Sequence, residues 1–360
     1  MTRERPAAQL LAARRLTAQG LSGEPATTPE DVVGRLLAVQ AQDPRGWRLA
    51  IRARSTGLAA ADVETALTKR RSMVVSWLNR GTLHLVPAED YWWLHPLTTP
   101  QLASSSVRRL AQEGVSPEQA ARGAELIAQA VSERPRSRDS LRGLLDENGV
   151  PTQRQAFVHV LLATCLSHDL VRGPVVDGEQ AFVSAAQWLG AAPAALDRDE
   201  ALARLALRYL AGHGPALVDD LAYWTGCTLG DARRGFAAIA AQTSSDADGL
   251  TWLTDSPKPA PVPGPRLLGP YDPLLHGWRS RLPVVGDHQG VVTSNGLFRP
   301  TALVRGKVVA TWGLADGTLT ISTLQPVPAS VQRALVRDAA AVLSYLGLPA
   351  KPAVVRSKDP

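Results

Sequence analysis

The 360-residue sequence predicts an α+β protein with three successive helix-and-hairpin units and a C-terminal antiparallel β-domain covered by a helix. First, groups of helical segments are each followed by a strand pattern, and this order recurs three times. Second, a proline-rich stretch, residues 256–265, separates these units from the rest of the chain. Third, the strands beyond it alternate with Asn-Gly, Arg-Gly and Asp-Gly turns, which are typical of an antiparallel meander. The predicted boundaries are 1–98, 99–190, 191–255 and 256–360.

The composition excludes several classes of protein. A hydrophobic content of 45% and a charged content of 20% are typical of a globular chain. We find no apolar run near the roughly 18 residues that cross a bilayer, and no signal-peptide pattern at the N-terminus. Cys165 and Cys227 fit no metal-ligand spacing and are expected to be free thiols in a reducing compartment. The sequence therefore predicts a cytoplasmic protein with no membrane association, no metal and no cofactor. Its net charge of +6 suits a nucleic-acid partner, although a GC-rich genome also favours arginine.

The first unit contains the segment on which the functional prediction depends. Thr28-Pro29 is a strong helix start, with a threonine cap and proline at the first helical position. We expect this helix to end at Asp43-Pro44, because Pro44 cannot continue it and disfavours a helical Asp43. Gln40 and Gln42 would then lie at the helix C-terminus. Further helices are expected at residues 5–19, 47–55 and 60–69, and a hairpin at 73–78 and 82–86 around Asn79-Arg80-Gly81.

The later units repeat this order. The expected helices of the second unit cover residues 116–133, 137–147 and 153–167, with strands at 169–173 and 180–183. Those of the third cover 199–211, 215–224 and 228–241, followed by a strand at 250–253. The expected strands of the β-domain cover 290–293, 298–304, 307–312 and 318–321, and a helix at 328–346 covers them. Helices followed by a two-stranded hairpin describe a winged helix, so the sequence predicts three tandem winged-helix motifs.

Four motifs together resemble the AlkZ-like winged-helix DNA glycosylases, a bacterial family. They are Gln40-Ala41-Gln42, Arg80-Gly81-Thr82-Leu83-His84-Leu85, Tyr271-Asp272-Pro273-Leu274-Leu275 and the segment 296–304. The resemblance implies three winged helices and a β-domain around a DNA channel, with a catalytic Gln-apolar-Gln motif in the first unit. Gln40 and Gln42 match that motif. A sister branch has Asp at the second position, so this chain is similar to the branch associated with bulky or crosslinked adducts. Several members of the family provide self-resistance in producers of DNA-alkylating antibiotics.

The chemistry of two glutamines fits one class of lesion. An N7-alkylated guanine carries a positive charge and leaves without protonation, so the enzyme needs mainly to hold a water and stabilise charge on the sugar. Amide carbonyls can do both, and a helix C-terminus would add partial negative charge. We therefore predict a monofunctional DNA glycosylase that hydrolyses the N-glycosidic bond of cationic N7-alkylated purines. Asp43 is a competing base or a supporting residue. The plainer interpretation is that Gln40 and Gln42 cap the helix or face water.

Basic and polar side chains near these motifs are candidates for contact with duplex DNA. Arg45 and Arg48 follow the glutamines, Arg52 and Arg54 continue the same helix, and Arg80 lies at a wing tip. A second group comprises Arg281, the hairpin-tip residues His288 and Gln289, and the strand residue Arg299. Solvated turns and surface arginines are the alternative.

Two other functions stay open. The chain is alternatively a non-catalytic winged-helix DNA-binding protein, such as a regulator or a protein that sequesters damage or a drug. A regulator usually reads a palindrome as a dimer, whereas three fused units predict a monomer. A scaffold with an incidental basic face would lack salt-dependent DNA binding.

Overall fold

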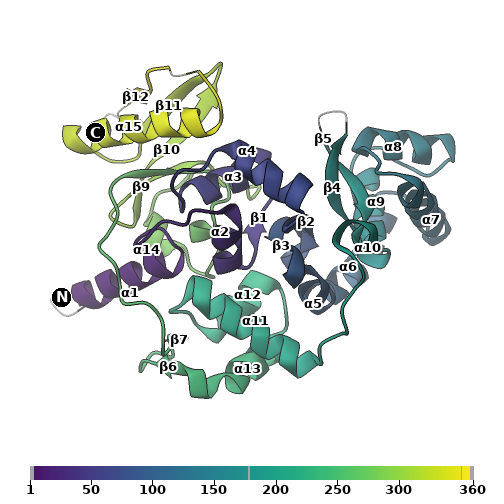
Figure 1. Cartoon of the computed structure of the whole chain (residues 1–360), viewed down its shortest axis with the longest axis horizontal. Helices are drawn as coiled ribbons and strands as arrows, with labels where there is room; N and C mark the ends of the chain where they lie inside the picture. Colours follow the sequence, from purple (N-terminus) through teal and green to yellow (C-terminus); the bar gives the residue numbers. More distant parts are fainter. Residues whose placement is uncertain (1–3, 177–178, 350, 357–360) are drawn as a thin grey trace. The chain divides into compact units, whose positions relative to one another are not determined.

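The computed structural model describes residues 4–176, 179–349 and 351–356, and the chain divides into two compact units. Unit 1 comprises Met1–Val63, Leu202–Trp224 and Thr228–Pro360. Unit 2 comprises Glu64–Ala201 and Thr225–Cys227. Figure 1 labels most of the elements of both. The α+β class is confirmed, whereas the three winged helices and the four predicted domain boundaries stay predictions.

The N-terminal elements follow the predicted order. They are α1 (Glu4–Ala18), α2 (Pro29–Leu36), β1 (Val39–Gln40), α3 (Pro44–Arg52) and α4 (Ala60–Thr65), followed by a π-helical turn (Ala66–Arg70). The side chain of Thr28 caps α2, as predicted, by accepting a hydrogen bond from the Asp31 N–H. The predicted extension of this helix to Gln42 is wrong, because α2 ends at Leu36 and Leu37 has a φ of 63°. Residues 36–39 are all buried. A one-sided helix that continued beyond Leu36 could not turn all of these residues to the core, so the non-helical segment that leads into β1 buries residues 37–39 instead.

Unit 2 contains a sheet flanked by helices. Its elements are β2 (Met73–Leu78), β3 (Thr82–Pro87), α5 (Ala88–Thr98), α6 (Pro100–Gln112), α7 (Pro117–Glu133), α8 (Arg138–Glu147), α9 (Ala156–Ser167), β4 (Leu170–Val176), β5 (Glu179–Ser184) and α10 (Ala185–Leu189). The strands lie side by side in the order β3-β2-β4-β5. Both predicted hairpins are present. A capping box at Ser116 starts α7, and Phe157, Leu141 and Ile127 belong to the core beneath.

Unit 1 also contains most of the third group of helices and the whole C-terminal β-domain. The helical group is α11 (Arg198–His213), α12 (Val218–Thr225) and α13 (Leu229–Ala238), followed by the strands β6 (Thr243–Ser245) and β7 (Thr251–Leu253). The β-domain contains β8 (Arg266–Leu268), α14 (Leu282–Val285), β9 (Thr301–Val304), β10 (Lys307–Ala315), β11 (Thr318–Thr323), α15 (Ala329–Tyr345) and β12 (Val354–Arg356). The strand order is β12-β11-β10-β9-β8, with β12 parallel to β11.

One predicted strand of the β-domain does not form. Residues 290–293 make only an isolated bridge, between Val292 and Phe298, across a turn that contains Gly296 at a φ of 79°. The short strand β8 pairs with β9 at the edge of the sheet instead. The predicted covering helix is present as α15, which packs against β8 and buries Leu335, Ala339 and Val342.

Candidate active site

Gln40 and Gln42 lie in the extended segment between α2 and α3. The Gln40 Nε2 group donates a hydrogen bond of 3.1 Å to Oε1 of Gln42. In an extended backbone, residues i and i+2 project from the same face. The structure therefore brings the two glutamines together, although the prediction that they lie at a helix C-terminus is wrong.

The carbonyl end of Gln40 is the unusual atom of this pair. Its Oε1 atom is buried and accepts no hydrogen bond from any residue that the structure describes. A buried acceptor without a partner is costly, typically by about 1–3 kcal/mol, and is rare in native proteins. The hydrogen bond from Nε2 to Gln42 fixes the amide and leaves the acceptor capacity of this oxygen unused. It can accept a hydrogen bond from a water or direct its dipole at a positive charge.

Asp43 caps the helix that follows the glutamines. Its Oδ1 atom accepts hydrogen bonds from the backbone N–H groups of Arg45 at 2.8 Å and Gly46 at 2.9 Å. Asp43 has a φ of −103°, outside the helical region as expected before proline, but Pro44 begins a helix here and does not end one. The predicted helix dipole therefore has the wrong sign. The glutamines lie at the positive end of α3, and the Asp43 carboxylate compensates that end.

Two glycines let the first turn of α3 touch another segment of unit 1. A Cβ atom at Gly46 would lie 2.5 Å from the carbonyl oxygen of Pro270. A Cβ atom at Gly269 would lie 2.8 Å from Leu49 Cβ and 2.9 Å from the Gly46 oxygen. The two backbones are thus in direct contact, and this contact fixes the start of α3 and the capped segment before it.

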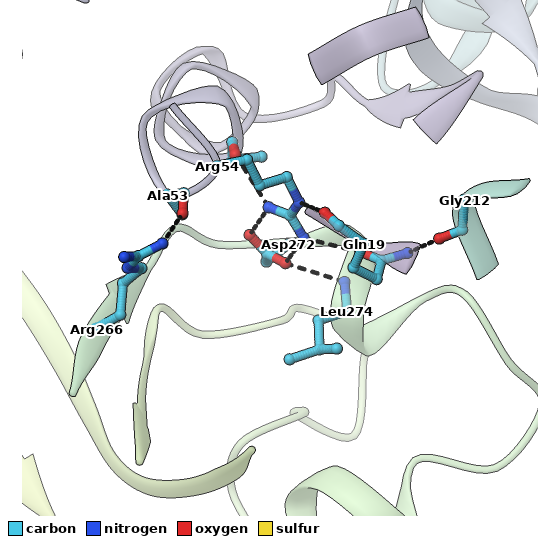
Figure 2. A network of polar contacts seen from close by, with 8 residues as sticks. Gln19, Ala53, Arg54, Gly212, Arg266, Asp272 and Leu274 are labelled. Atoms are coloured by element: carbon cyan, nitrogen blue, oxygen red, sulfur yellow. Dashed lines mark hydrogen bonds and ion pairs between the residues drawn. The ribbon is translucent and has the colours of Figure 1, made fainter. Parts of the chain in front are cut away.

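A buried ion pair holds the other end of α3. The Arg54 and Asp272 side chains are 1% and 0% exposed, and their two hydrogen bonds measure 2.8 and 2.9 Å. Figure 2 shows Arg54 between Asp272 and Gln19. Its remaining N–H groups donate to the Gln19 backbone oxygen, Gln19 Oε1 and the Ala50 oxygen at 2.8, 2.9 and 2.9 Å, so all five are used. Asp272 also accepts from the Leu274 N–H at 2.9 Å.

The arginines of α3 therefore have different environments. Arg54 is internal, and Arg52 makes a two-pronged ion pair with Asp338 of α15 at 2.6 and 2.9 Å. The expectation that these two line a DNA surface is wrong for both, because each guanidinium is engaged inside unit 1. Arg45 is exposed. Arg48 is half-buried, with its guanidinium 3.9 Å from the centre of the Trp47 ring.

The other predicted DNA contacts also divide into internal and exposed side chains. Arg281 donates to the Leu275 oxygen at 3.0 Å and to the Tyr223 hydroxyl at 2.8 Å. His288 and Gln289 lie in the turn after α14, so their predicted place at the tip of a strand hairpin is wrong. Arg299 is exposed and precedes β9 rather than lying within a strand. In unit 2, Arg80 is exposed at the tip of the β2–β3 hairpin, with a φ of 57°.

Tyr271 also belongs to this region, although we predicted no role for it from the sequence. It adopts a φ of 56°, which is strained for a large L-residue. Its ring centre lies 5.6 Å from that of Phe298 and 5.9 Å from that of His276. Burial and, next in size, the charge of Asp43 raise the pKa of Tyr271. Tyr271 directly precedes Asp272, whose buried partner Arg54 lies 218 positions away, so no local sequence signal reveals these surroundings.

The described residues hold no cluster of three His, Cys, Asp or Glu side chains suited to a metal ion. Nor does any helix in the same part of the chain combine the length and hydrophobicity needed to cross a membrane. The arrangement offers instead a pair of amides with one free buried carbonyl, a capped helix beside them, and exposed arginines.

Comparisons with known proteins identify related chains. The model of the family described as DNA glycosylase AlkZ-like matches residues 33–345. The protein named interstrand DNA cross-link repair glycosylase, from Streptomyces sahachiroi, is 28% identical over 351 residues, which cover 90% of this chain and 93% of that protein. Among solved structures, the Streptomyces sahachiroi DNA glycosylase AlkZ matches with a TM-score of 0.78 and 25% identity, covering 97% of this chain and 99% of that one.

Proposed function

Because this chain belongs to the DNA glycosylase AlkZ-like family, we propose that it excises cationic N7-alkylated purines from duplex DNA by hydrolysis. We extend the proposal to bulky and interstrand-crosslinked adducts, because a similar protein is named as a cross-link repair glycosylase. We further propose that it acts as a monomer in the cytoplasm, and that it protects its host against a DNA-alkylating natural product.

The reaction breaks the bond between the purine N9 atom and the C1′ atom of the sugar. The N7-alkylated base takes the electron pair of that bond and leaves as a neutral molecule. The sugar becomes an oxocarbenium-like cation, a water oxygen forms the new bond to C1′, and the surplus proton passes to solvent. The protein does not need to protonate the base, so it needs no strong acid.

The observation that carries this proposal is the buried, unpartnered Oε1 atom of Gln40 beside Gln42. In this proposal that oxygen accepts a hydrogen bond from the attacking water and stabilises positive charge at C1′. Asp43 has an electrostatic part in this account. Its carboxylate offsets the positive end of α3, which would otherwise disfavour a cation next to the glutamines. A neutral amide is a poor base, so the proposal also requires that undamaged purines and uracil are not released.

The test uses a duplex with a single N7-methylguanine, treated with alkali after incubation to cleave abasic sites. We expect cleavage with the wild type and none with Gln40→Ala/Gln42→Ala. Gln325→Ala, at an exposed position of unit 1, is the matched control and should cleave like the wild type. Strand cleavage before alkali would contradict a monofunctional enzyme. Retained cleavage in the double variant would refute the role of the glutamines.

A crosslinked duplex extends the same assay to the second part of the proposal. Unhooking of the two strands by the wild type and not by Gln40→Ala/Gln42→Ala is the expected result. For DNA contact we propose the exposed side chains Arg45, Arg80, Gln289 and Arg299, with the half-buried Arg48 and His288 beside them. An alanine variant at a phosphate-contacting arginine should lower the salt dependence of binding by about one unit of slope.

A further inference from the structure

A small cavity opens in unit 1 beside the cap of α3. Its volume is about 150 Å³. Leu49 of α3, Trp312 and Leu314 of β10, and Leu346 at the end of α15 form its apolar wall. These four side chains come from three elements of unit 1, so the cavity is built by the packing of the β-domain against α3.

Three of the lining residues add no free hydrogen-bond donor to this apolar wall. Pro270 and Pro300 also line the cavity, and proline has no backbone N–H to donate. The indole N–H of Trp312 is already used, because it donates to the Leu268 oxygen at 2.9 Å. Trp312 therefore presents an apolar surface. This part of the lining matches a hydrocarbon group better than a sugar, a phosphate or a bare nucleobase.

The volume sets the size of that group. An engineered cavity of about 150 Å³ with an apolar lining binds benzene. A single aromatic ring or a short alkyl chain therefore fits this cavity, whereas a purine with its sugar does not.

The position of the cavity connects it with the glutamine pair. Asp43 and Arg45 line its polar side, and Asp43 directly follows Gln42 in the chain. Neighbouring Cα atoms are about 3.8 Å apart, so the cavity lies within about one residue of the glutamine pair. The exposed Arg45 at the same side suits the phosphate backbone that such a base carries.

We propose that this cavity is a subsite for an apolar, ring-sized substituent on the N7-alkylated base, and that it favours bulky adducts over methylated ones. The proposal rests on the proposed function, since it assigns a substituent of the same substrate. The ring lies against Trp312 and Leu346, while the cationic base stays at Gln40 and Gln42. Leu49, Leu314 and Leu346 are thus specificity-determining residues.

The experiment compares duplexes that carry N7-methylguanine or N7-benzylguanine. Leu346→Trp fills the cavity, and Leu348→Trp, at a position that is 37% exposed two residues further along, is the matched control. Single-turnover excision is measured for duplexes with either base. The affinity for each lesion is measured separately, with duplexes whose lesion carries a 2′-fluorinated sugar so that the base is not released. Leu314→Trp fills the cavity from a different element and replaces Leu346→Trp if that variant does not fold.

We expect the wild type to prefer the benzyl over the methyl lesion by about tenfold or more, which corresponds to the burial of one ring. This preference should fall to near unity in Leu346→Trp and persist in Leu348→Trp. An unchanged preference in a folded cavity-filling variant, or no preference in the wild type, would overturn the subsite. A wild type that excises neither base would refute the proposed function instead, and the ratio of the two affinities would still decide whether the cavity holds the ring.

Discussion

Removal of the Asp272 carboxylate should destabilise unit 1 severely, because it leaves a buried guanidinium without its counter-charge. Arg54 and Asp272 are 1% and 0% exposed, so neither is compensated by water. Asp272→Ala leaves two N–H groups of Arg54 and the N–H of Leu274 without their acceptors. At about 1–3 kcal/mol for each unsatisfied buried donor, the two guanidinium donors alone give about 2–6 kcal/mol. This range agrees with the roughly 3–5 kcal/mol that breaking a buried pair costs.

Urea unfolding followed by tryptophan fluorescence measures this loss as a fall in the transition midpoint. The matched control is Asp219→Ala, because Asp219 pairs with Arg279 at 3.6 Å and both side chains are exposed, 51% and 70%. An exposed pair contributes about 0–1 kcal/mol. The double variant Arg54→Met/Asp272→Leu removes both charges and should cost less than Asp272→Ala alone. If Asp272→Ala costs no more than Asp219→Ala, the buried pair does not hold α3 and the reasoning is wrong.

Further predictions concern the segment around the glutamines and the buried histidine of α11. Gly46→Ala places a Cβ atom 2.5 Å from the Pro270 oxygen and should lower both stability and excision. The control is Gly34→Ala, whose Cβ would meet no described atom within 4 Å and which should stabilise α2 by about 0.5–1 kcal/mol. The urea midpoint should therefore fall in the first variant and rise in the second. Asp43→Ala removes a helix cap and should cost about 1 kcal/mol of stability, whereas Asp43→Asn keeps a capping oxygen. If Asp43→Asn loses excision at unchanged stability, the negative charge of Asp43 itself takes part in the reaction. Burial lowers the pKa of His213 from 6.5 to about 3, so the unfolded chain binds the proton first and the free energy of unfolding falls as the pH drops from 6.5 towards 3. His213→Phe should flatten this part of the curve of stability against pH.

Local signals predicted the elements whose ends are set by neighbouring residues. The capping threonine of α2 and the capping box of α7 are both short-range patterns, and both helices begin where these patterns indicate. The β2–β3 hairpin and α15 likewise follow from the alternation and periodicity of their own residues. Such features could be predicted because the interactions that determine them join residues a few positions apart.

The arginines near α3 could not be sorted in this way. Arg45, Arg48, Arg52 and Arg54 look alike as a series of basic residues after the glutamines. The partner of Arg54 lies 218 positions away, and that of Arg52 lies 286 positions away. Only the packing of the C-terminal domain against α3 makes two of these side chains structural and leaves Arg45 exposed. A count of basic residues therefore overestimates the surface available to a nucleic acid.

The glutamine segment contains a local signal, the pair Asp43-Pro44, that marks the start of a helix and that we interpreted as the end of one. Asp43-Pro44 has the same form as Thr28-Pro29 and Ser116-Pro117, a capping side chain followed by proline at the first helical position. A consistent interpretation makes Asp43 the start of a helix, so the residues before it must be non-helical. Gln40 and Gln42 then lie two apart in an extended chain and share a face, as two side chains that act on one water must. The same step changes the electrostatic argument, since the partial charge beside the glutamines becomes positive and needs the Asp43 carboxylate to offset it. The capping residue is therefore part of the environment of the glutamine pair.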